Sequence, residues 1–141
     1  MSDRTTTDPR IELERRIDAI EAGYEFLLAY AAQGRRTDRG AARGQNVRDH
    51  LERMEQALDG LGTVVLACAD GADPALRGSC EAFFAAVEAD ARTAQGAIRL
   101  VLAQGDIGSQ LVDNLNASIH LRALLTDLFV VDEALGAKRK A

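Results

Sequence analysis

The sequence contains few histidine, cysteine or methionine side chains that could bind a metal ion or a haem iron. The chain has two histidines, His50 and His120, and Met54 is one of its two methionines. A di-iron carboxylate bundle needs Glu-x-x-His on two helices, but Val47 and Ala117 stand three residues before the histidines. The C-x-x-C-H motif of a c-type haem is also absent. Met54 and His120 could serve as axial ligands of a b-type haem. A haem- or metal-holding bundle is therefore the weakest alternative, and we expect no cofactor.

The two cysteines, Cys68 and Cys80, do not form a C-x-x-C pair. Both fall on apolar helical stripes, where a thiol acts as a small hydrophobic side chain, although their spacing alone leaves a bridge between them open. The sequence contains no G-x-S-x-G, no P-loop and no G-x-G-x-x-G motif. We therefore expect a non-catalytic protein.

A basic segment is the strongest candidate for a binding site. Residues 35–44 contain four arginines and one aspartate, which gives a local charge of +3 in a chain whose net charge is −5. The arginines are Arg35, Arg36, Arg39 and Arg43. We expect this segment to link two helices at the end of the fold where the second and the fourth helix begin. Helix N-termini carry free N–H groups and about half a positive charge.

Polar side chains near these two helix starts would complete the site. They are Gln45, Asn46, Arg48, Ser109, Gln110 and Asn114. Arginines, amide side chains and helix N-termini together suit a carboxylate, a phosphate or an acidic protein partner. The competing interpretation is that the arginines form a solvated connector and that Asn114 fixes the register of its helix.

The elements that would position these residues are all expected to be helices. The composition is rich in Ala and Leu and has only two prolines, which favours helix. Each proline follows an aspartate, at Asp8-Pro9 and Asp73-Pro74. An aspartate can cap the free N–H groups, and proline suits the first helical position. We expect helices over about 9–33, 38–69, 74–104 and 107–135.

The second helix has an uncertain start and two internal glycines. It could begin at Thr37 or Asp38, or only after Gly44. Its apolar stripe is the clearest in the chain and consists of Val47, Leu51, Met54, Leu58, Leu61, Val65 and Cys68. Gly60 and Gly62 each cost about 1 kcal/mol relative to alanine inside a helix. They indicate a bend or the close approach of a neighbouring element.

The helix expected over 107–135 organises the rest of the fold. Its seam advances in alternating steps of three and four residues and consists of Ile107, Gln110, Asn114, Ala117, Leu121, Leu124, Leu128, Val131 and Leu135. A 3.5-residue period predicts packing along the whole length of the helix. Beyond this seam, Phe129 and Val130 extend the apolar surface over more than one face, which favours a homodimer.

Four long helices joined by short links predict an all-α fold, an antiparallel up-down-up-down four-helix bundle. We expect one domain over 8–136, a disordered N-terminus over 1–7 and a basic tail over 137–141. Two rival architectures are a helical hairpin that dimerises into a bundle and helices that extend into a longer oligomeric coil.

Composition limits the function further. The net charge of −5 argues against nucleic acid as a partner. The first ten residues contain no apolar signal core, and the longest apolar run, 64–69, is far shorter than the ~20 residues of a membrane span. We expect a cytoplasmic homo-oligomer, with a dimer favoured, that binds a protein partner as an adaptor or accessory protein. The main alternative is a bundle that binds a small anionic ligand at its Arg-rich end.

Overall fold

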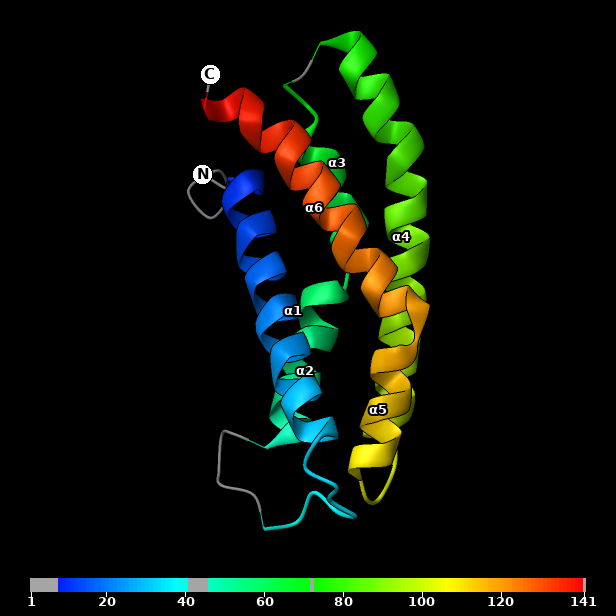
Figure 1. Cartoon of the computed structure of the whole chain (residues 1–141). Helices are drawn as coiled ribbons and strands as arrows, with labels where there is room; N and C mark the ends of the chain where they lie inside the picture. Colours follow the sequence, from blue (N-terminus) through cyan, green and yellow to red (C-terminus); the bar gives the residue numbers. More distant parts are fainter. Residues whose placement is uncertain (1–7, 41–45, 72, 141) are drawn as a thin grey trace, which may run out of the picture.

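The part of the chain that the structure describes folds entirely into α-helices (Figure 1). The computed structural model describes residues 8–40, 46–71 and 73–140, except for the side chains of 119, 120 and 135–140. Within these ranges there are six helices and no strand: α1 (Pro9–Ala31), α2 (Val47–Leu58), α3 (Leu61–Cys68), α4 (Pro74–Leu102), α5 (Ser109–Ala117) and α6 (Ile119–Lys140). The all-α prediction is confirmed, but six helices replace the four expected. The predicted disordered N-terminus lies outside the described residues.

The predicted helix starts are confirmed by their caps. The carboxylate of Asp8 accepts a hydrogen bond from the N–H of Arg10 at 3.0 Å, and that of Asp73 accepts one from the N–H of Leu76 at 2.9 Å. Asn46 caps α2, so the second helix begins after Gly44 rather than at Thr37 or Asp38.

The helix predicted over 38–69 is broken between α2 and α3, and both glycines contribute. Gly60 has φ +67°, a left-handed backbone conformation that residues with a side chain rarely adopt. Gly62 lies so close to α4 that a Cβ there would be 2.8 Å from Cε1 of Phe84 and would also collide with Glu88. The N–H of Gly62 donates to Oε1 of Glu88 at 3.1 Å, so a side chain of α4 stabilises the first turn of α3.

The helix predicted over 107–135 is also broken, at Ser118, which has an extended ψ of 126°. The expected seam holds after the break, where Leu121, Leu124, Leu128 and Val131 are buried. Before the break, Ile107 is buried as expected. The prediction is wrong for Gln110 and Asn114, which are exposed, whereas Val112 and Leu115 are buried instead. At 100° per residue, a straight helix would turn the two amides toward the core and the two apolar side chains toward solvent. The break lets α5 rotate so that its apolar side chains are buried.

The last helix also ends later than expected. α6 continues to Lys140, so the prediction that the helix ends at 135 and leaves a separate basic tail is wrong. A single glycine costs only about 1 kcal/mol inside a helix, and Gly136 alone therefore does not have to stop it.

The core lies between α1 and α4. α1 packs against α2, α3, α5 and α6, and α4 packs against α2, α3, α5 and α6 as well. The stripe predicted for the second helix is confirmed, because all seven of its residues are buried. Met54 is fully buried and packs on α1 at Gly23, where a Cβ would collide with its side chain.

The two halves of α4 differ in how much of their surface is covered. Val87, Ala91 and Ile98 are buried, whereas Cys80 and Phe83 in the N-terminal half are only partly buried. Figure 1 shows the N-terminal half of α4 extending beyond the end of α3. None of the described helices is both long and apolar enough to cross a membrane.

Candidate functional site

The connector that follows α1 and the link between α4 and α5 meet at one end of the fold, as the sequence predicts (Figure 1). Ser109 joins them through three hydrogen bonds. Its N–H donates to the carbonyl oxygen of Arg35 at 2.8 Å, and its Oγ accepts from the N–H of the same residue at 2.8 Å. Its Oγ also donates to the carbonyl oxygen of Tyr30 at 2.7 Å. The Tyr30 hydroxyl in turn donates to the carbonyl oxygen of Ile107 at 2.6 Å. The two connections are therefore joined by the hydroxyl groups of Ser109 and Tyr30 and by backbone groups.

Arg48, in the first turn of α2, is occupied by partners within the chain. Its Nε donates to Oδ2 of Asp38 at 2.7 Å. Its Nη1 donates to the carbonyl oxygen of Leu102 at 3.1 Å, and its Nη2 donates to those of Gln104 at 2.7 Å and Gly105 at 3.1 Å. These oxygens belong to the C-terminal end of α4 and the residues that follow it, where carbonyl groups lack helical partners. Arg48 thus supplies hydrogen-bond donors to carbonyl oxygens at the C-terminal end of α4. It does not present its guanidinium to an external anion.

Arg35 has a similar structural role inside its own connector. Its Nε donates to the carbonyl oxygen of Thr37 at 3.1 Å and its Nη2 to that of Arg39 at 2.8 Å. Its guanidinium also lies 5.9 Å from the centre of the Tyr30 ring. The hydroxyl of Thr37 donates to Oδ1 of Asp106 at 2.6 Å, which adds a second link between the two connections.

The remaining predicted site residues are dispersed around this end. The side chain of Arg39 is 82% exposed and lies 3.6 Å from Asp106, and Arg36 is exposed as well. Asn46 caps α2. The exposed side chains of Gln110 and Asn114 bond to each other at 3.3 Å. Arg43 and Gln45 lie outside the described residues.

Asp38 is the central acidic residue of this end, and the sequence analysis did not include it in the site. Its Oδ1 accepts from the N–H of Ile107 at 2.9 Å, while its other oxygen binds Arg48. Burial acts to raise the pKa of Asp38, but the hydrogen bonds from Arg48 and Ile107 outweigh burial and lower it. In the sequence, the only sign of this role is that Asp38 is the one carboxylate among the four arginines of residues 35–44.

Among the described side chains, His50, Met54 and the two cysteines do not form a metal-ligand set. The His50 ring stacks on Phe26, with ring centres 3.8 Å apart, and burial lowers the pKa of its imidazole. Met54 is in the core, and the side chain of His120 is outside the described part of the chain. Within that part, no group of three or more His, Cys, Asp or Glu residues could hold a metal ion. Neither cysteine is in a disulfide.

A polar cleft of about 530 Å³ lies where the break between α2 and α3 crosses α4. Gln95 is buried at 8% exposure, and its Nε2 donates to Oε2 of Glu55 at 3.0 Å and to Oδ1 of Asp59 at 3.1 Å. Arg99 pairs with Glu55 at 2.7 Å, and Arg92 pairs with Glu88 at 2.7 Å. Arg92, Arg99 and Glu88 of this cleft are therefore engaged in ion pairs, while Asp59 accepts a hydrogen bond from Gln95.

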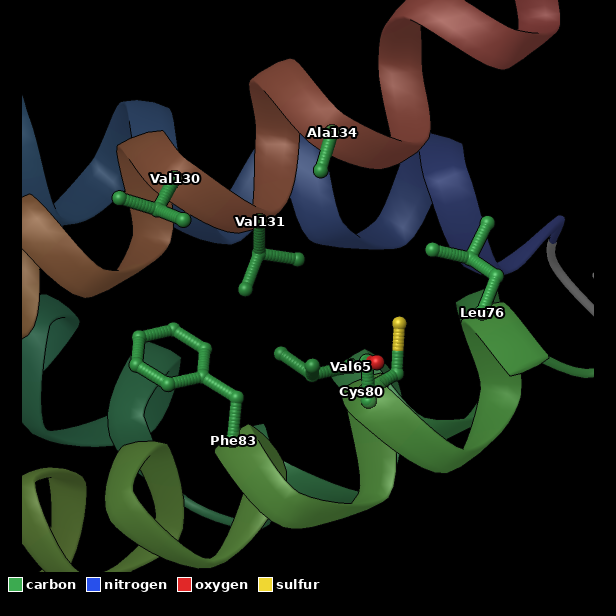
Figure 2. Close-up of a pocket in the computed structure, with 8 residues that line it drawn as sticks. Val65, Leu76, Cys80, Phe83, Val130, Val131 and Ala134 are labelled. Carbon is green, nitrogen blue, oxygen red and sulfur yellow. The ribbon is translucent and has the colours of Figure 1, made fainter.

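An apolar cavity of about 180 Å³ lies between α3, α4 and α6 (Figure 2). Its walls are formed by Val65 of α3, by Leu76, Ser79, Cys80 and Phe83 of α4, and by Val130, Val131 and Ala134 of α6. Of these lining residues, Val65 and Val131 are buried, whereas Ser79, Val130 and Ala134 are exposed. The cavity lies beside the N-terminal half of α4, where that helix is least covered.

Two carboxyl groups face each other between α4 and α6. Burial, a hydrogen bond with Asp90 and the charge of Asp90 together raise the pKa of Asp127 to about 7. Oδ2 of Asp127 is buried and has no hydrogen-bond partner among the described residues. No motif pairs these two residues in the sequence, so only the packing of α6 on α4 reveals them.

Comparison with known proteins gives no relative. No known protein family matches the sequence. No curated protein matches it either. No solved structure resembles the fold closely enough to count as a match.

Proposed function

We propose that this chain is a non-catalytic, homo-oligomeric helical bundle that acts as an interaction or accessory protein. In this proposal the six helices form an antiparallel four-helix bundle, in which α2 with α3 and α5 with α6 are broken helices. Two copies associate through the outer face of α6, and the dimer binds a protein partner in the cytoplasm.

The observation that carries the proposal is the pair of exposed apolar side chains on α6. Phe129 is 47% exposed and Val130 is 53% exposed, at consecutive positions of one helix. Aromatic side chains at the centre of an interface contribute a large share of the binding energy. Neither residue is needed to fill the core, which Leu128 and Val131 already fill from the same helix turn.

The Arg-rich end supports an anionic ligand less well. Arg35 and Arg48 are committed to backbone carbonyl oxygens and to Asp38, so an anion would have to displace these partners. Within the described residues, Arg36 and Arg39 are the exposed arginines of the predicted set. Exposed arginines that no other protein group holds in position bind an anion only weakly, and this binding is sensitive to salt.

The test is the mass of the protein in solution, measured by light scattering after size exclusion. We expect twice the chain mass for the unmodified protein and a shift to the monomer mass for Phe129→Asp. Leu28→Asp is the matched control, because Leu28 of α1 is 49% exposed, and this variant should remain a dimer. An unmodified protein that stays monomeric at high concentration would refute the self-association proposal.

A further inference from the structure

We propose that the cavity between α3, α4 and α6 binds one small, uncharged, apolar molecule of about the size of benzene or indole. The cavity volume is about 180 Å³. A protein cavity of about 150 Å³ with apolar walls remains dry and takes up benzene. This proposal does not rest on self-association and would hold for a monomer.

The side chains of the cavity wall select against charged ligands. Val65, Val131 and the ring of Phe83 point into the space (Figure 2). The side-chain polar groups of the lining residues are the Ser79 hydroxyl and the Cys80 thiol, both neutral. A charged group placed here would lose its hydration without gaining a partner. An apolar molecule would gain contacts that the empty cavity cannot supply.

Small side chains explain why the chain does not fill the space itself. α4 contributes Ser79 and Cys80, and α6 contributes Ala134, so the walls on these two sides are short. Val65 and Val131 are the most deeply buried lining residues, at 2% and 7% exposure. Three helices line the space, which is a concave site between elements rather than a flat docking face.

The size of the cavity argues for a small molecule rather than a second copy of the chain. Eight residues line it, whereas a stable protein interface uses about 20–30 residues on each side. A partner could place at most one side chain in the cavity. Val130 lines the cavity and also belongs to the exposed apolar pair on α6, whereas Phe129 is not a lining residue, so Phe129→Asp can separate the two proposals.

Cys80 provides a reporter within the cavity. Its thiol lines the wall and is partly buried, while Cys68 is 7% exposed and lies outside the lining. We expect benzene or indole to slow the alkylation of Cys80 by N-ethylmaleimide in a saturable manner. The alkylation of Cys68, followed in the same sample by peptide mass spectrometry, should not respond to either probe.

Thermal unfolding with benzene and with indole provides the decisive test. At ten times the dissociation constant of the probe, we expect Tm to rise by about 3–5 °C. Cys80→Leu and Ala134→Leu, which fill the cavity from two different helices, should abolish this rise. The exposed Ala89→Leu on α4 is the control and should retain it.

Three results would overturn the proposal. The first is the absence of any change in Tm and in Cys80 alkylation with either probe. The second is a rise in Tm that persists in both cavity-filling variants, which would locate the bound probe elsewhere. The third is binding that appears only when dilution dissociates the protein, since a side chain of a second copy would then be the occupant.

Discussion

Arg48, in the first turn of α2, donates its Nη1 to the carbonyl oxygen of Leu102, the last residue of α4, at 3.1 Å. The same guanidinium binds Asp38 of the connector at 2.7 Å. One side chain therefore joins the start of one helix, the end of another and the loop between the first two helices. Its contribution should be to stability rather than to ligand binding.

Replacing Arg48 should destabilise the protein strongly. Arg48→Met leaves the Asp38 carboxylate and several carbonyl oxygens without their charged donor, and we expect a loss of about 2–3 kcal/mol of unfolding free energy. Urea denaturation would measure this loss. Arg36→Met, at an exposed position of the same connector, is the control and should change stability by less than about 0.5 kcal/mol. Equal and small effects of the two changes would contradict the structural role of Arg48.

Replacing Gly62 and replacing Gly96 by alanine should change the stability of the protein in opposite directions. Gly62→Ala places a methyl group 2.8 Å from Cε1 of Phe84 and against Glu88, and we expect it to cost about 1–3 kcal/mol. Gly96→Ala adds a methyl group at an exposed position of α4, where no atom outside the backbone of the helix itself lies within 4 Å of the new carbon. The higher helix propensity of alanine should then stabilise the protein by about 0.5–1 kcal/mol. Two changes of the same sign would mean that α3 does not approach α4 at Gly62 as described.

The Asp90–Asp127 pair should make stability depend on pH. The folded pKa of Asp127 is raised to about 7, whereas an unfolded aspartate titrates near 3.9. Between about pH 4 and pH 7 the folded state therefore keeps a proton that the unfolded state releases. Because the folded state binds this extra proton, the contribution of Asp127 to the free energy of unfolding falls as pH rises from about 4 to about 7. Above about pH 7 this contribution is constant.

Asp127→Asn isolates this effect. Because solvent screens this partly exposed group, we expect the variant to gain only on the order of 1–2 kcal/mol of unfolding free energy relative to the unmodified protein between pH 5 and pH 8. Asp132→Asn, at an exposed position of the same helix, should show no such gain. Denaturation curves at the two pH values would measure the difference, and parallel behaviour of the two variants would show that Asp127 titrates normally.

Asn116 offers a test of the break at Ser118. Its side chain is 6% exposed, and neither its Nδ2 nor its Oδ1 has a partner among the described residues. A buried amide without partners costs about 1–3 kcal/mol. We therefore expect Asn116→Leu to be neutral or to stabilise the protein by about 1 kcal/mol. Asn114→Leu is the matched control at an exposed position, and it should change stability by less than about 0.5 kcal/mol. A clear destabilisation by Asn116→Leu in chemical denaturation would show that α5 does not bury this residue.

The parts of the fold that depend on nearby residues could be predicted from the sequence. The caps at Asp8 and Asp73 each use a side chain and an N–H within three residues of one another. The stripe from Val47 to Cys68 could be predicted for the same reason, because the period of a helix is a local property. The break at Gly60 leaves the apolar stripe intact. The buried residues were therefore predicted correctly, although the prediction of one continuous helix was wrong.

The break at Ser118 could not be predicted from the periodic pattern. That pattern placed Gln110 and Asn114 on the seam because it assumed one straight helix. The choice between this register and the observed one depends on whether Val112 and Leu115 find a buried surface, which α1 and α4 provide. The packing energy between segments that are distant in the sequence selects the observed register. The apolar pattern of a single helix does not contain that information.

The sequence could predict that residues of the hypothetical site lie near one another, but it could not predict the partners of their arginines. Arg35, Arg48 and Ser109 do lie at the end where the two connections meet. Their partners could not be inferred, because the sequence does not show that Asp38 folds back against Ile107. The apolar cavity and the Asp90–Asp127 pair were missed for the same reason, since each forms only where α4 and α6 meet.

The bonds made by Ser109 also bear on the order of folding. They join residues that are 74 and 79 positions apart, to Arg35 and Tyr30 respectively. Closing so long a stretch of chain costs entropy before any contact repays it, so local pairs such as α3 with α4 are favoured to form earlier. Contacts that form after the transition state affect the unfolding rate and leave the refolding rate nearly unchanged. We therefore expect that a hydrogen bond lost at this connected end of the fold would shorten the lifetime of the native state without slowing its formation.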